Sequence, residues 1–68
     1  MFDKYGVELE EGNQVIVSSV DKSQQPYFGK YRILEIEYCD YLDCFLALVN
    51  HEDGDWVSSE DVIYLQGV

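Results

Sequence analysis

Residues 31–50, YRILEIEYCDYLDCFLALVN, decide the fold of this chain. Residues 31–38 and 44–50 are rich in Ile, Leu, Val, Phe and Tyr, which favour β-strands. Residues 40–43 between them have the length of a hairpin connection and carry two aspartates. The stretch therefore predicts two long antiparallel strands joined by a short acidic turn, the central hairpin of an all-β fold.

Alternation along the first of these strands predicts which side chains are buried. Successive side chains of a strand point to opposite faces, so Leu34, Ile36 and Tyr38 share one face. The other face carries a more polar set, namely Ile33, Glu35, Glu37 and Cys39. We expect the first face to belong to the core and the second to be partly exposed and negatively charged.

The segments on either side of the hairpin predict shorter elements. Before it, residues 14–20 form a strand with Val15 and Val17 on one face, and the polar residues 21–29, which contain the only proline, form a long loop. After it, residues 51–54 form a turn that ends in Asp-Gly, and residues 55–57 a short strand with the lone tryptophan. Residues 58–61 are expected to form one serine-capped helical turn, and residues 62–65 the last strand. Residues 2–12 form a lead-in with Val7 and Leu9 as anchors.

This order of elements resembles the SH3-like barrel over nearly the whole chain. Residues 26–36, PYFGKYRILEI, look like the glycine and following strand of KOW-type and other small bacterial and phage SH3-like domains. Residues 54–65, GDWVSSEDVIYL, look like the strand, helical turn and final strand that close such barrels. The resemblance implies an antiparallel barrel of about five strands, with one short helical turn before the last. It does not extend to the proline-peptide binders, whose paired tryptophans are absent here.

Length and composition predict a single folded domain spanning residues 1–68. The apolar share of 47% argues against intrinsic disorder. The longest apolar run, residues 45–49, is far too short to cross a membrane, and the first residues lack the pattern of a signal peptide. We therefore expect a soluble, cytoplasmic protein.

The charge of the chain is large and unevenly distributed. The formal net charge is −10, and the four basic side chains, Lys4, Lys22, Lys30 and Arg32, all precede residue 33. Residues 33–68 contain nine acids and no lysine or arginine. Such a field repels nucleic acid and anionic membranes and attracts a basic protein.

The predicted partner-binding residues are the nine acids in the second half of the chain and one tyrosine of the hairpin turn. They are Glu35, Glu37, Asp40, Asp43, Glu52, Asp53, Asp55, Glu60, Asp61 and Tyr41. Duplex DNA carries about one negative charge per 1.7 Å of its axis, so a surface rich in carboxylates can imitate it. The first hypothesis is a phage or prophage protein that binds a basic host protein, with inhibition by imitation of nucleic acid as its sharpest form. The second is an accessory subunit that docks through aromatic loops, its charge serving only solubility.

Other chemistry finds little support in the sequence. Cys39 and Cys44 flank the hairpin turn and are expected to be reduced, packing thiols rather than a disulfide. Residues 51–55, HEDGD, have oxygen donors but not the spacing of an EF-hand, so a plain turn explains them better than a metal site. No catalytic constellation or cofactor fingerprint is present, and we expect a protein that is not an enzyme and uses no cofactor.

Overall fold

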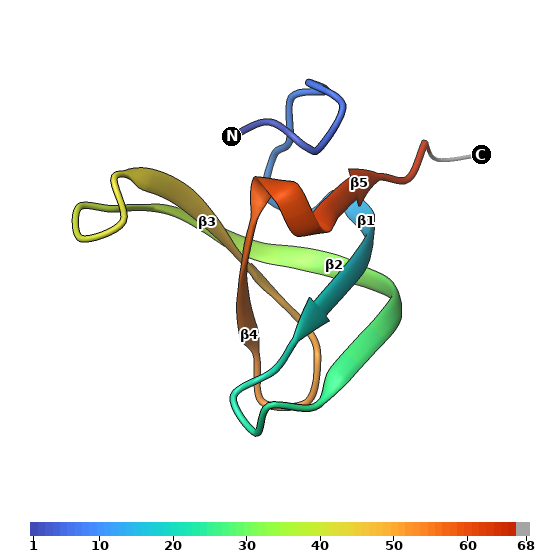
Figure 1. Ribbon diagram of the computed structural model, residues 1–68. Coiled ribbons are helices and arrows are strands. Elements are labelled where there is room, and N and C mark those ends of the chain that lie inside the picture. Colours follow the sequence, from blue (N-terminus) through green and yellow to red (C-terminus); the bar gives the residue numbers. More distant parts are fainter. Residues whose placement is uncertain (67–68) are drawn as a thin grey trace.

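The computed structural model describes residues 1–66 of the chain as an all-β fold. Five antiparallel strands, β1 (Gln14–Val20), β2 (Pro26–Cys39), β3 (Cys44–Val49), β4 (Asp55–Ser58) and β5 (Val62–Tyr64), form one sheet in the order β4-β3-β2-β1-β5 (Figure 1). A single 3-10 turn, η1 (Ser59–Asp61), precedes β5. The strand order and the position of this turn confirm the predicted SH3-like class. Within residues 1–66 no helix is long and apolar enough to span a membrane.

β2 holds the two halves of the sheet together. It is 14 residues long, pairs with β1 from Pro26 to Arg32, and pairs with β3 from Ile33 to Cys39. The strand curves through the molecule in Figure 1, so that β1 and β5 lie on one side and β3 and β4 on the other. This one strand therefore sets the position of every other element.

A β-bulge in β2 overturns the predicted burial pattern at the start of the hairpin, at Ile33 and Leu34. Ile33 lies opposite Val49, but Glu35 lies opposite Leu48, so two steps along β2 match one step along β3. The extra residue reverses the expected alternation before the bulge only; after it Ile36 packs against the core and Glu35 and Glu37 are exposed, as predicted. Ile33, expected on the polar face, is 1% exposed, whereas Leu34, expected in the core, is 46% exposed. Tyr38 is also 46% exposed, because it lies near the end of the hairpin, beyond the core.

The core is small and consists mainly of valine. Its buried hydrophobic side chains come from all five strands and from the N-terminal segment: Leu9, Val15, Val17, Ile33, Ala47, Val49, Val57 and Val62. Val15 and Val17 share one face of β1, as predicted. Val7, predicted as an anchor with Leu9, is 41% exposed, and only Leu9 packs into the core.

Two further local predictions are wrong. The predicted loop over residues 21–29 is a turn of residues 21–25, because Pro26 already begins β2 opposite Val20. Proline is tolerated as the first residue of a strand, and the aromatic side chains after it favour extended backbone. The predicted serine cap of η1 is also absent, since Ser58 makes no side-chain capping bond and instead ends β4.

Asp3 fastens the N-terminal segment to the last strand. Its carboxylate is 5% exposed. Oδ1 accepts hydrogen bonds from the backbone N–H groups of Tyr5 and Val7, and Oδ2 accepts one from Tyr64, each at 2.8 Å. Burial by itself raises the pKa of Asp3, but the N–H donors of Tyr64, Val7, Tyr5 and Gly6 together bring that pKa below its ordinary value of 3.8.

We predict that Asp3→Asn lowers the free energy of unfolding by about 1–3 kcal/mol at neutral pH, because an amide cannot accept at both positions. A carboxyl whose pKa is lower in the folded state stabilises the fold above its unfolded pKa, and this contribution disappears as pH falls through the folded value. The difference between wild type and variant should therefore shrink below about pH 3.8. Urea unfolding across this range measures it. Asp40→Asn, in the exposed hairpin turn, is the matched control.

Candidate functional site

The predicted partner-binding acids do not form one continuous surface. Glu35 and Glu37 lie on β2, and Asp40 and Asp43 on the β2–β3 turn. Glu52 and Asp53 lie on the β3–β4 turn, and Glu60 and Asp61 on η1. In Figure 1 the β2–β3 turn projects to the left, whereas the β3–β4 turn lies at the bottom beside the β1–β2 turn. The carboxylates thus occupy three separate places.

Asp55 and Asp61 are less exposed to solvent than the other predicted partner-binding residues. Asp55 is 7% exposed and accepts a hydrogen bond from the Tyr27 hydroxyl at 2.5 Å. Asp61 is partly buried and accepts one from Ser19 at 3.3 Å. Tyr41, by contrast, is 93% exposed at the hairpin turn. Asp55 therefore has a structural role and does not belong to an exposed binding surface.

Acidic and apolar side chains share one face of the hairpin and β4. Residues paired directly across antiparallel strands point to the same side of the sheet. One row pairs Glu35 with Leu48, and Leu48 with Trp56. The next row pairs Glu37 with Leu46, and Leu46 with Ser58. We call this surface the outer face, defined by Glu35, Glu37, Leu46, Leu48 and Trp56.

The outer face is hollowed beside Trp56. Glu37, Tyr38, Cys39, Leu46 and Trp56 line a shallow depression. Trp56 is 42% exposed, Glu37 is exposed at the hollow, and Glu35 is exposed in the same cross-strand row as Trp56, with Leu48 between them. A cationic side chain with an apolar stem finds here both a π-surface and negative charge. Residue order alone does not indicate this combination, because Trp56 is 19 to 21 positions away from the two glutamates and only strand pairing aligns them.

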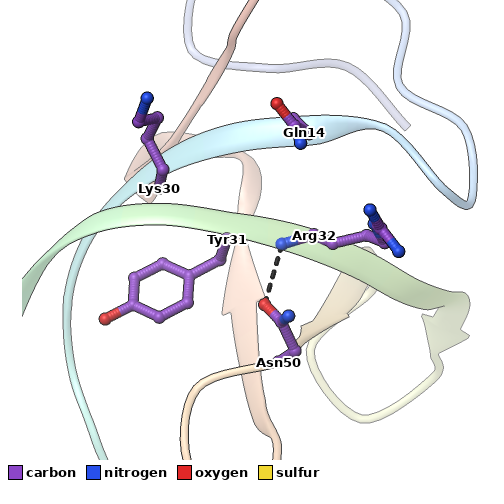
Figure 2. A pocket seen from close by; sticks show the side chains of 5 residues that line it. All are labelled: Gln14, Lys30, Tyr31, Arg32 and Asn50. Carbon is purple, nitrogen blue, oxygen red and sulfur yellow. Dashed lines mark hydrogen bonds between the residues drawn. The ribbon is translucent and has the colours of Figure 1, made fainter.

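Basic residues lie further along the same strand. Lys30 and Arg32 are exposed on β2 and, with Gln14, Tyr31 and Asn50, line a second hollow (Figure 2). Asn50 Oδ1 accepts a hydrogen bond from the Arg32 backbone N–H at 2.8 Å, and the Tyr31 ring extends away from the Lys30 side chain. The exposed side of β2 is therefore positive before the bulge and negative after it.

An aromatic and polar cluster joins β2 to the two turns at the bottom of Figure 1. The rings of Tyr27 and His51 stack with centroids 3.8 Å apart, and Tyr31 packs edge-on against both. Burial and the hydrogen bond to Asp55 raise the pKa of Tyr27 well above its ordinary value of 10.0. The Tyr27 hydroxyl therefore remains protonated and donates to the buried Asp55 carboxylate.

The cysteines lie together, as the hairpin prediction requires. Cys39 and Cys44 are directly paired across β2 and β3, and both are free thiols.

The nearby Tyr38 hydroxyl donates a hydrogen bond to Asp43, which raises the pKa of that tyrosine.

We predict that Tyr27→Phe lowers the free energy of unfolding by about 1–3 kcal/mol, because the Asp55 carboxylate loses its hydroxyl donor while remaining buried. Chemical denaturation followed by tryptophan fluorescence measures the change. Tyr5→Phe removes the same atom from a ring that is 70% exposed and should have little effect. Equal losses in the two variants would contradict the role given to the Tyr27–Asp55 bond.

Comparisons with models of protein families, with curated proteins and with solved structures found no match, so the function rests on the geometry described above.

Proposed function

We propose that this chain is a non-enzymatic, cytoplasmic binding domain that captures a basic protein on its outer face. The observation that carries the proposal is that Glu35 lies in one cross-strand row with Leu48 and the exposed Trp56, while Glu37 lies in the next row with Leu46. A nucleic-acid-binding host protein is the partner class we favour, because its basic surface already accommodates a polyanion. A phage or prophage origin belongs to the same proposal.

Each part of the outer face supports a different part of the recognition. The carboxylates attract lysine and arginine over a distance set by salt, about 8 Å at physiological ionic strength. Leu46, Leu48 and the indole of Trp56 give the aliphatic stems of those residues an apolar surface to cover. A guanidinium over the indole adds about 0.5–1 kcal/mol at an exposed site.

Imitation of nucleic acid is the narrower form of the proposal. Only Glu35 and Glu37, with Asp40 and Asp43 at the turn, follow one another along the hairpin. The hairpin acids can therefore occupy a short part of a partner's nucleic-acid groove. The acids of η1 and the β3–β4 turn lie elsewhere and contribute to the general field of the protein.

Docking through aromatic residues is a second candidate, favoured by a separate hollow. Met1, Phe2, Tyr38, Cys44 and Phe45 are among the residues that line it. Phe2 and Phe45 are 55% and 47% exposed, which is high for phenylalanine on a small domain. A partner that binds here would be held by apolar contact and would be insensitive to salt.

We predict that Glu35→Gln/Glu37→Gln weakens binding of a labelled oligo-arginine peptide by about three- to tenfold at low salt. Fluorescence anisotropy of the label gives the affinity, and quenching of Trp56, the only tryptophan, locates the contact. Affinity should fall with added sodium chloride. Trp56→Ala should weaken binding at every salt concentration.

The matched control is Glu8→Gln/Glu10→Gln, which removes the same charge from exposed positions in the N-terminal segment. Equal weakening by both pairs would mean that only net charge acts, and the outer face would not be the binding surface. Pull-downs from bacterial lysate with wild type and both pairs extend the test to natural partners. Capture that resists salt and is lost in Phe45→Ser would favour the aromatic hollow instead.

A further inference from the structure

The only histidine of the chain meets two carboxylates where the β1–β2 and β3–β4 turns come together. Donor atoms of Asp21, His51 and Glu52 all lie within 4.8 Å of one another. Asp21 is 30 residues before His51 in the sequence, and the curvature of β2 brings the two turns to the same end of the molecule (Figure 1). The sequence pattern HEDGD includes two of these residues but not the third.

His51 and Asp21 form a long hydrogen bond, and the separation of its two atoms also fits two ligands of one metal ion. His51 Nε2 and Asp21 Oδ2 are 3.4 Å apart, which is long for a hydrogen bond. Two ligand atoms bound to one tetrahedral Zn²⁺, each about 2.0–2.2 Å from the ion, lie about 3.4 Å from each other. Glu52 is exposed on its turn, so its carboxylate can complete the third position by rotation.

The imidazole ring of His51 is already oriented. It stacks on Tyr27 with an interplanar angle of 2° and meets Tyr31 edge-on. Its Nδ1 lies 3.2 Å from the Tyr31 hydroxyl, which can either donate to that nitrogen or accept from it. When Nδ1–H donates to Tyr31, the lone pair of Nε2 is free for a metal. Such a second contact is usual for histidine ligands.

The two oxygens of the Asp21 carboxylate have different roles: one holds the side chain in place and the other faces the proposed metal site. Oδ1 accepts hydrogen bonds from the backbone N–H groups of Ser23 and Gln25, at 2.9 and 3.0 Å, which hold the side chain in place. Oδ2 faces His51. The surrounding hollow is also lined by Asp53 and Asp55 and by one cation, Lys22, so acids outnumber bases there. A divalent cation relieves the mutual repulsion of these carboxylates.

We propose that Asp21, His51 and Glu52 form a binding site for a divalent transition-metal ion of the Zn²⁺ class, which ties the β1–β2 turn to the β3–β4 turn. An imidazole nitrogen selects such ions over Mg²⁺ and Ca²⁺, which prefer oxygen ligands alone. Water or Asp53 supplies the fourth ligand. None of its three ligands belongs to the outer face, so the proposal does not rest on the proposed function.

Titration of the full chain with zinc chloride tests the proposal. We expect the imidazole proton resonances of His51, which are unambiguous in a chain with one histidine, to shift on addition of Zn²⁺ but not of magnesium chloride. The melting temperature should rise with Zn²⁺.

Substitutions at individual residues test which side chains bind the metal ion. His51→Asn and Asp21→Asn should each weaken Zn²⁺ binding by tenfold or more, and Asp21→Asn keeps the Oδ1 acceptor that holds the turn. Glu60→Gln removes an exposed acid from η1 and should leave the affinity unchanged. Cys39→Ser/Cys44→Ser distinguishes binding by the hairpin thiols and should also leave it unchanged.

Two results would overturn the proposal. One is the absence of any shift of the His51 resonances in wild type at millimolar Zn²⁺, which does not depend on whether a variant folds. The other is equal Zn²⁺ affinity in wild type and His51→Asn, which would reduce the effect to general attraction by acids or to binding by the thiols.

Discussion

The fold depends on one strand that belongs to both halves of the sheet. β2 pairs with β1 along its first half and with β3 along its second, and the bulge after Ile33 lies where the pairing changes. The bulge turns Ile33 into the core and Leu34 to the outside, while Glu35 and Glu37 keep the exposed positions that plain alternation gives them. Without the extra residue the hairpin would present Leu34 to the core and Ile33 to solvent.

A chain of this size has a small core, and polar contacts add to the apolar contacts that hold its segments together. The core is mostly valine, with Ile33 its largest fully buried side chain. Two buried carboxylates join segments that the sheet does not pair. Asp3 binds the N-terminal segment to β5, and Asp55, at the start of β4, accepts a hydrogen bond from the Tyr27 hydroxyl of β2. Each is satisfied by donors, which is the condition for burying a charge. Part of the acidity of the chain is therefore structural.

Strand pairing places the remaining acids beside different kinds of side chain. Beside Trp56, Glu37 borders an apolar hollow and Glu35 lies in the row of Trp56, which suits a basic protein. Beside His51, the carboxylates of Asp21 and Glu52 border an imidazole, which suits a metal ion. The same type of side chain thus supports two proposals, and what distinguishes them is the neutral or aromatic group that the fold places next to the charge.

The sequence by itself determined the order of the strands, the all-β class and the segregation of charge, because alternation and turn residues are local properties. It placed residues 26–29 in a loop, although they begin β2. It also identified Glu35 and Glu37 as exposed. It did not reveal the bulge, since an extra residue in one strand is defined only against its partner. Nor did it reveal that Asp55 is buried or that Asp21 reaches His51. Those contacts join residues 28 and 30 positions apart, and only the curvature of β2 and the pairing of its neighbours decide which distant side chains meet.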